Sequence, residues 1–288
     1  MQHHHEPSLS KDLETLSHIA PDRRRVLHWL TAGSAAALPL MGCGGGGSAT
    51  TSSTTTTAST TTTTTATAAS TSACTVIPTE TAGPYPGDGT NSVGASVVNA
   101  LTLAGIVRSN IKPSFAGATG VAAGVPLTVT LKLVNTGASC VSLAGYAVYL
   151  WHCSRDGLYS MYSAGVTAEN YLRGVQVSDS NGEVTFSTIF PGCYAGRWPH
   201  MHFEVFASQA LATSLPANDQ VRTSQLALPK SACDAVYAST GYNASVGNLA
   251  GVSLASDGVF SNDSAATQIP VVTGSVAAGY VATLTVGV

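Results

Sequence analysis

Two histidines in the second half of the chain lie two residues apart in a segment that alternates like a strand. The segment is His200-Met201-His202-Phe203-Glu204-Val205-Phe206. Successive side chains of a strand point to opposite faces, so His200, His202 and Glu204 share one face. Two neutral imidazoles side by side can both bind one metal ion, and imidazole suits iron, copper and zinc alike. The spacing predicts a metal-binding strand face, with a plain polar face as the alternative.

The residues around this strand add donors of other kinds. Pro191-Gly192 is a turn signal that delivers Tyr194 ahead of the strand, and Arg197 stands where it could hold an anionic ligand near the metal. Further upstream, a predicted strand at Ala147–Cys153 leads into a turn at Ser154–Ser160, which contains Tyr159. Tyrosinate is a hard anionic oxygen donor that favours ferric iron. Two phenolates and two imidazoles on one metal would therefore favour ferric iron. Taken alone, Tyr159 would instead be a turn aromatic with its hydroxyl in water, and Tyr194 a core aromatic.

Only one other histidine, His152, follows Cys43 in the sequence. It directly follows Trp151 at the end of a predicted strand. We expect it to be a hydrogen-bonded structural histidine rather than a fifth ligand. Cys153 and Cys193 lie close in sequence to the two tyrosines, and we expect a buried thiol or a disulfide there rather than metal ligands.

Taken in chain order, these segments resemble the intradiol ring-cleavage dioxygenases, the family of catechol and protocatechuate dioxygenases. The resemblance covers Cys74 to Val288. Its motifs are Thr79-Glu80-Thr81-Ala82-Gly83-Pro84-Tyr85, the Asp-Gly-Leu-Tyr-Ser turn, Pro-Gly-Cys-Tyr at 191–194 and the His-x-His pair.

The resemblance implies that Tyr159, Tyr194, His200 and His202 bind Fe(III). It also implies an active-site role for Arg197 and, through a looser match, for Gln225, whose spacing from His202 is longer than in the cytoplasmic enzymes. Glu80 and Tyr85 would then help to line the pocket, with a surface turn as the alternative.

The reaction that the resemblance implies inserts both atoms of O2 into a catechol-type substrate. The bond between the two hydroxylated carbons breaks, and the product is a cis,cis-muconate-type diacid. Tyr194 would be displaced by the substrate and would take up one of its protons, while Arg197 would stabilise developing charge. The alternative for Arg197 is a salt bridge to Asp156 or Glu204.

Two other functions stay open at this point. One is a catalytically inactive β-sandwich envelope lipoprotein that binds aromatic ligands or partners. The other is a zinc or copper enzyme built on His200 and His202. The sequence does not indicate which catechol would be the substrate, nor the oligomeric state.

The composition predicts an all-β fold, because charged residues are scarce, Gly, Ser, Thr, Ala and Val are abundant, and long amphipathic helical patterns are absent. We expect an antiparallel β-sandwich of about eight strands, with long loops that form the metal site. Predicted strands include Leu101–Val107, Pro126–Val134, Tyr146–His152 and Tyr280–Val286, and a hairpin is expected to turn at Asn181-Gly182. The segment Ile111–Val125 is a candidate pocket rim. The sandwich would occupy residues 74–288.

The first 73 residues carry targeting and linker patterns. Residues 1–43 resemble a twin-arginine lipoprotein signal, with Arg23-Arg24-Arg25, a short apolar run and a lipobox-like Leu40-Met41-Gly42-Cys43. Residues 44–73 are a Gly/Ser/Thr-rich linker, expected to be disordered. The sequence predicts an exported protein of the periplasm or cell envelope, attached to the membrane only through a lipid at Cys43, with cleavage to a soluble periplasmic protein as the alternative.

The charge of the chain limits the classes of partner, and its cysteines permit disulfides. The formal net charge is -3, and beyond residue 25 there is no Lys/Arg cluster, which argues against a nucleic acid partner. Six cysteines in an exported chain permit disulfides, and a bridge between Cys74 and Cys233 is one prediction. The expected partners are a small catecholic substrate and O2.

Overall fold

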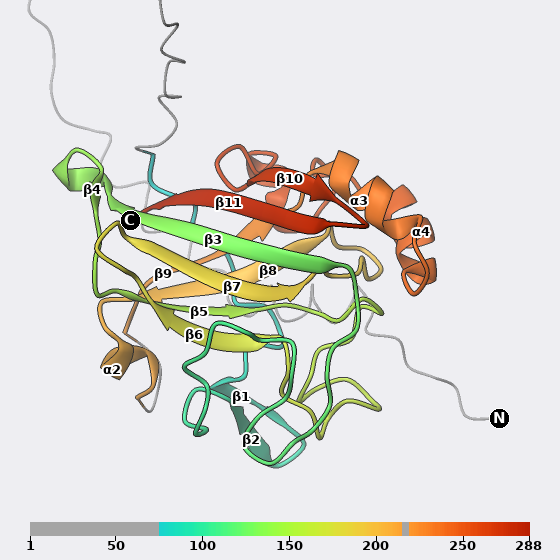
Figure 1. Cartoon of the computed structure of the whole chain (residues 1–288), viewed down its shortest axis with the longest axis horizontal. Coiled ribbons are helices and arrows are strands. Elements are labelled where there is room, and N and C mark those ends of the chain that lie inside the picture. Colours follow the sequence, from blue (N-terminus) through green and yellow to red (C-terminus); the bar gives the residue numbers. More distant parts are fainter. Residues whose placement is uncertain (1–74, 215–218) are drawn as a thin grey trace, which may run out of the picture. The chain divides into compact units, whose positions relative to one another are not determined.

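The computed structural model of the chain describes residues 75–214 and 219–288, which form mainly β structure (Figure 1). The strands are β1 Asp88–Val93, β2 Ser96–Asn99, β3 Pro126–Asn135, β4 Val141–Ser142, β5 Ala147–Trp151, β6 Arg173–Val177, β7 Glu183–Ile189, β8 His200–Phe206, β9 Gln220–Ala227, β10 Val271–Ser275 and β11 Gly279–Gly287. The helices are α2 Gln209–Ala212, α3 Lys230–Tyr237 and α4 Asn243–Ala250, with 3-10 turns η3 Thr136–Ala138 and η4 Phe260–Asn262.

Two sheets carry most of these strands. One has the order β6-β5-β8-β9 and is antiparallel throughout. The other runs β10-β11-β3, after which β7 pairs with the first part of β3 and β4 with its end. Its β11–β3 pair is parallel, so the expectation of a purely antiparallel sandwich is wrong for this sheet. In Figure 1, β11, β3 and β7 run next to one another in front of the paler β8 and β9.

The main hydrophobic core lies between the two sheets. In β3 the alternate residues Leu127, Val129 and Leu131 are buried, while the residues between them are partly exposed. They belong to one cluster with Phe186 of β7 and Phe203 of β8. Strand β8 is buried on both faces, so its polar face with the two histidines is turned away from this core and must be covered by loops.

One of the predicted strands differs from the structure. Leu101–Val107 is a series of turns, in which the side chain of Asn99 accepts a hydrogen bond from the Leu101 amide at 2.8 Å and Gly105 adopts a φ of +96°. The apolar residues there, Leu101 and Ile106, pack in a second core cluster on the outer face of the four-stranded sheet. They cover that face without forming a strand, although Val107 makes an isolated parallel bridge to Val175 of β6.

The turn at Asn181-Gly182 is present, but it does not close a hairpin. The Asp179 side chain accepts hydrogen bonds from two backbone amides of this turn, and Gly182 has a φ of +78°. The strands on either side, β6 and β7, belong to different sheets. The turn therefore carries the chain from one layer of the sandwich to the other.

The predicted disulfide between Cys74 and Cys233 is wrong, because Cys233 is a free, buried thiol on α3. Cys153 and Cys193 are also free and buried. Cys140, in contrast, is disulfide-bonded.

The predicted signal segment with its lipobox at Cys43 and the predicted linker both lie outside the described residues, so they stay predictions. Within the described ranges, no helix has the length and apolar character needed to cross a membrane.

His152 connects the two sheets. It follows β5, is only 2% exposed, and its Nε2 lies 2.7 Å from Oγ1 of Thr188 in β7, while its Nδ1 lies 2.8 Å from the carbonyl oxygen of Cys153. Since a carbonyl oxygen only accepts, Nδ1 carries the hydrogen and the threonine hydroxyl donates to Nε2. The prediction of a hydrogen-bonded structural histidine is confirmed.

This histidine should make stability fall in acid. Burial lowers the pKa of His152 to about 4, against about 6.5 in an unfolded chain. Between these pH values the unfolded chain binds a proton here that the folded chain does not, so the free energy of unfolding falls as the pH falls from about 6.5 to about 4. His152→Gln should make this decline shallower, by at most about 3 kcal/mol over the interval.

Denaturant unfolding at pH 7 and pH 4.5 measures this difference. Thr188→Val is the control, since it removes the hydrogen bond but leaves the titrating group, and should lower stability at both pH values. Equal pH dependence in wild type and His152→Gln would contradict the assignment.

Candidate metal centre

The central strand β8 holds both histidines on the outer face of the four-stranded sheet. His200 and His202 are each 2% exposed. The Nδ1 of His200 bonds to the carbonyl oxygen of Trp198, so it carries the hydrogen and leaves Nε2 with a free lone pair. The ring of His202 is stacked on Trp151, its cross-strand partner in β5, with 5.0 Å between centroids and 8° between planes. Each of the two rings is therefore held in a fixed orientation.

The two tyrosines reach the same point from two loops. The Tyr159 hydroxyl lies 3.2 Å from Nε2 of His202, and the Tyr194 hydroxyl lies 3.3 Å from Nε2 of His200. The two Nε2 atoms are 3.1 Å apart. The structure thus brings together, at one point, the four side chains that the sequence predicted as metal ligands.

Glycines allow the two tyrosine loops to pack this closely. Gly157, two residues before Tyr159, has a φ of +79°, and a Cβ there would lie 3.0 Å from Cβ of Tyr194. A Cβ on Gly192 would lie 2.4 Å from the carbonyl oxygen of Arg155, well inside contact distance. The Asp-Gly and Pro-Gly signals in the sequence are therefore the local reason for the approach.

Burial shapes the charge of the four donors. It lowers the pKa of His202 well below its ordinary value, with a further contribution from His200, and it does the same for His200, helped by the charge of Arg197. Burial, together with Tyr194, raises the pKa of Tyr159 well above its ordinary value. Neutral imidazoles are the form that binds a metal.

The donor set fits Fe(III). Two imidazole nitrogens and two phenol oxygens meet in a buried space, and a trivalent cation would lower the pKa of both phenols and supply the missing positive charge. Among the described residues, no group of three or more His, Cys, Asp and Glu side chains could hold a metal ion. Burial also raises the pKa of the Cys153 and Cys193 thiols to about 12, so both are neutral.

Arg197 lies beside the donors, and its partner was not predicted. Its Nε forms a salt bridge with Asp257 at 3.0 Å, and its Nη2 donates to the Gln225 side chain at 2.7 Å. The expected alternatives, Asp156 and Glu204, are not its partners. Burial acts against the charge of Arg197, but Tyr194 and Asp257 raise its pKa above the ordinary value, so it stays protonated.

Asp257 is completely buried and accepts four hydrogen bonds. Its Oδ2 takes those of Arg197 and the Trp198 amide, and its Oδ1 those of the Val259 and Phe260 amides. It lies 60 residues after Arg197, in a segment without strand or helix periodicity. The one sequence signal for this role of Asp257 is that aspartate is common just before a turn.

Gln225 lies opposite His202 in the register of β8 and β9. It is fully buried, and its amide nitrogen donates to the carbonyl oxygen of Thr81 at 2.8 Å. The predicted Gln225 is therefore next to Arg197, as the resemblance implied, although the geometry alone does not assign it a role.

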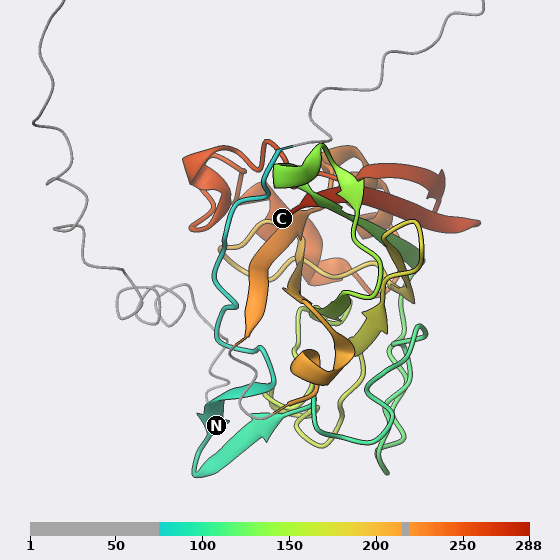
Figure 2. The same cartoon turned by 90° about the vertical axis from the view of Figure 1, so that its left-hand side faces the viewer.

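The segment from Glu80 to Tyr85 covers the outer face next to β9, beside which it runs in Figure 2. The Glu80 amide bonds to the carbonyl oxygen of Thr223. Gly83 has a φ of +70°, and a Cβ added there would lie 3.2 Å from the His202 ring. The Tyr85 ring contacts the Tyr159 ring at 4.9 Å. The predicted placement of Glu80 and Tyr85 near the site agrees with these contacts.

Buried Arg173 holds this cover in place. Its guanidinium donates to the carbonyl oxygens of Tyr85, Pro86 and Ser160, and to the Ser160 hydroxyl. It thereby ties the covering segment to the loop that carries Tyr159. Arg173 therefore has a structural role in the described domain.

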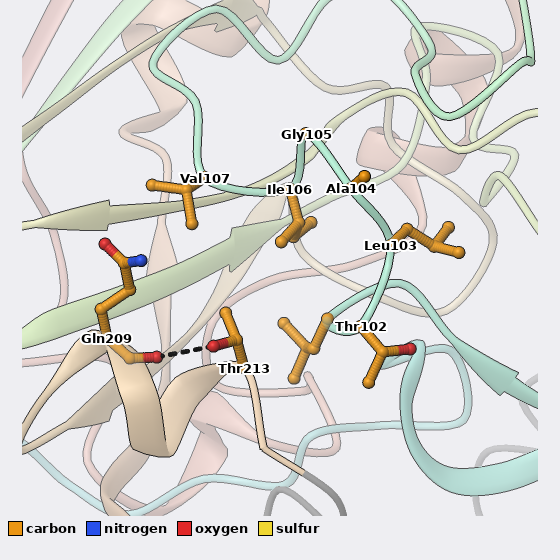
Figure 3. A pocket seen from close by; sticks show the side chains of 9 residues that line it. Thr102, Leu103, Ala104, Gly105, Ile106, Val107, Gln209 and Thr213 are labelled. Carbon is orange, nitrogen blue, oxygen red and sulfur yellow. Dashed lines mark hydrogen bonds between the residues drawn. The ribbon is translucent and has the colours of Figure 1, made fainter.

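A shallow pocket lies elsewhere, between the turns at 101–107 and helix α2 (Figure 3). Gln209 and Thr213 line its α2 side, and a hydrogen bond from Oγ1 of Thr213 to the Gln209 carbonyl closes that turn of helix. None of the four donor residues lines it. The chemistry of the four donors therefore does not extend to this pocket.

Comparison with protein families gives one match. Residues 112–219 match the family described as Dioxygenase, a range that includes all four donors and Arg197. A comparison with curated proteins gives no match.

Comparison with solved structures points to the same family. An intradiol ring-cleavage dioxygenase from Tetranychus urticae is 25% identical, with a TM-score of 0.54, over 74% of this chain and 94% of that one. The dioxygenase domain of a carbohydrate-binding fusion protein from Streptomyces sp. SirexAA-E is 22% identical, with a TM-score of 0.45, over 74% of this chain and 98% of that one. With the family match, the first of these similarities shows that the chain carries an intradiol ring-cleavage dioxygenase-like domain.

Proposed function

We propose that this protein is a non-haem Fe(III) dioxygenase that inserts both atoms of O2 into a catechol-type aromatic, with intradiol cleavage to a cis,cis-muconate-type diacid. One observation carries the proposal: two phenol oxygens and two imidazole nitrogens converge within 3.1–3.3 Å at a buried point. A binding module has no need of such a donor set. The matched family and the name of the spider-mite relative support the same activity.

Tyr159, Tyr194, His200 and His202 would hold the iron, which supplies a Lewis acid that lowers the pKa of a bound diol and activates the ring toward O2. Tyr194 is less buried than Tyr159 and lies on the Arg197 side of the site, so it is the phenol best placed to receive a substrate proton. Arg197, held by Asp257 and Gln225, would stabilise negative charge that develops on the substrate oxygens. The loops over the outer face would limit access of water.

The two alternative functions, an inactive aromatic-binding lipoprotein and a zinc or copper enzyme, predict absorption spectra that differ from that of a ferric tyrosinate enzyme.

We further propose that the protein is exported by its twin-arginine-type segment and anchored at Cys43, which would place the reaction in the cell envelope. The export and the lipid anchor are both inferred from the sequence patterns of residues 1–43.

A visible absorption spectrum of the purified full chain, before and after anaerobic addition of catechol, tests the activity class. Ferric tyrosinate absorbs visible light strongly and Zn(II) does not. We expect a broad band that shifts when catechol binds, followed by O2 uptake on aeration. A protein that stays colourless after ferric reconstitution would instead favour the binding module.

Replacing one phenol ligand should weaken the centre. Tyr159→Phe keeps the ring that packs on Tyr85 but removes the oxygen, so we expect much of the visible band to disappear. Iron affinity should drop at least about tenfold, because mutating even a residue that only hydrogen-bonds to a metal ligand typically causes a loss of that size. Iron content and absorbance measure both. Tyr146→Phe, a half-buried tyrosine packed on the main core, is the control and should leave both unchanged. An unaltered spectrum in Tyr159→Phe would remove this residue from the ligand set.

Asp257 should act through Arg197 rather than on the iron. Asp257→Asn leaves a buried guanidinium without its charge partner, which typically costs about 3–5 kcal/mol of stability. We expect kcat/KM for catechol to fall by at least about tenfold, because the lost charge-assisted hydrogen bond orients Arg197. The visible band should remain, because the hydrogen bonds that Asp257 accepts come from Arg197 and backbone amides. Steady-state kinetics on iron-loaded protein measure the first effect and absorbance the second.

The matched control is Asp234→Asn. Asp234 also pairs with a cation, Lys230 at 2.7 Å, but both side chains are more than half exposed, so the change should alter stability by less than about 1 kcal/mol and leave kinetics unaffected. Loss of the visible band in Asp257→Asn would show that Asp257 supports the metal itself, contrary to this assignment.

A further inference from the structure

Given the dioxygenase activity proposed above, we propose that the site selects catechols whose ring bears no acidic substituent, and that Glu80 is the residue that rejects one. The argument depends on where the positive charges of the domain lie, and on which charges surround Arg197.

Binding of a carboxylate beside the reacting diol would need a cation with donors to spare. The chain has twelve Lys and Arg residues, of which four precede residue 26. The other eight all fall within the described residues: Arg108, Lys112, Lys132, Arg155, Arg173, Arg197, Arg222 and Lys230.

Two arginines, buried Arg173 and partly buried Arg108, donate mainly to backbone carbonyl oxygens. Arg173 is 1% exposed, and its donors go to carbonyl oxygens and a hydroxyl of the covering loops. Arg108 donates to the carbonyl oxygens of Arg173 and Pro113 and lies over the Phe115 ring at 4.2 Å. Neither can turn to a substrate without losing these bonds.

The remaining cations either lie away from the four donors or are engaged by other groups. Lys132 is on β3 in the opposite sheet, and Lys230 pairs with Asp234 on α3. Arg222 bonds to the Thr79 hydroxyl, and Arg155 packs over Gly241 and pairs with Asp156 at 3.8 Å. Lys112 lies on the loop at 111–125, where its amide makes an exposed hydrogen bond to Asn110.

Arg197 is therefore the cation of the site, and acidic groups outnumber it there. Asp257 neutralises it directly at 3.0 Å. Glu80 is linked to Arg197 through two glutamines, because Gln268 donates to the Glu80 carboxylate and to the carbonyl oxygen of Gln225, whose side chain accepts from Arg197. With Glu80 ionised, Asp257 and Glu80 together outweigh the single charge of Arg197, and an anionic ring substituent beside them would add to this negative charge.

Glu80 is placed to exert this effect. It opens the segment that covers the donors, and its Oε1 accepts a hydrogen bond of 3.3 Å from Gln268, which also donates to the carbonyl oxygen of Gln225. The side chain is only partly buried, and burial first, then Asp263 and Asp257, raise the pKa of Glu80 to about 7. It is therefore mostly ionised at pH 8, which is the pH to use.

The test compares 3,4-dihydroxybenzoate with 3,4-dihydroxybenzamide, which match in size and differ in charge. The iron-loaded full chain is assayed for O2 uptake at pH 8. We expect kcat/KM for the amide to exceed that for the benzoate by about tenfold or more. Glu80→Gln should raise kcat/KM for the benzoate severalfold and leave the amide nearly unchanged. Glu183→Gln makes the same chemical change on β7 in the opposite sheet and should leave the ratio as in wild type.

The outcomes separate the two proposals. Cleavage of the benzoate as fast as the amide by the wild type would overturn the charge selection and leave the dioxygenase activity standing. A high ratio that Glu80→Gln does not reduce would overturn the role of Glu80. Failure to cleave catechol itself, together with no visible band after ferric reconstitution, would refute the proposed activity on which this inference rests.

Discussion

Polar side chains that share one buried space need partners for their hydroxyls and ring nitrogens, and the outer face of the four-stranded sheet is organised around that constraint. The hydroxyls of Tyr159 and Tyr194 and the Nε2 atoms of His200 and His202 lie in a space from which burial excludes water. Without a metal, the cost of this arrangement appears as shifted pKa values in opposite directions for the histidines and for Tyr159. With a trivalent ion between them, as proposed, the same groups would serve as ligands.

The fold supplies this arrangement by placing the two faces of β8 in different surroundings. Met201, Phe203 and Val205 fill the core between the sheets, and their packing fixes the strand. The other face is closed by loops, and Arg173 and Asp257 hold those loops through hydrogen bonds to backbone groups far apart in the sequence. Fully satisfied buried charges of this kind define one geometry, and removing one partner is costly.

The mistaken predictions share a physical origin. At 101–107 the apolar residues suggested a strand, but their burial comes from covering a sheet, and Asn99 and Gly105 favour turns. At Asn181-Gly182 the turn chemistry was recognised, yet the local sequence does not state whether the next strand pairs with the last one or joins another sheet. For the cysteines, pairing depends on distances in the fold, and Cys233 is buried in α3 as a thiol.

The sequence by itself determined the β character of the domain, the strand with His200 and His202 on one face, and the turns that carry Tyr159 and Tyr194, because alternation and turn residues act over a few neighbours. Only the tertiary structure decided that these four donors meet, that Arg197 pairs with Asp257, and that Glu80 is linked to Arg197 through Gln268 and Gln225. Contacts across 60 residues or more arise from sheet order and loop packing, which local patterns do not encode.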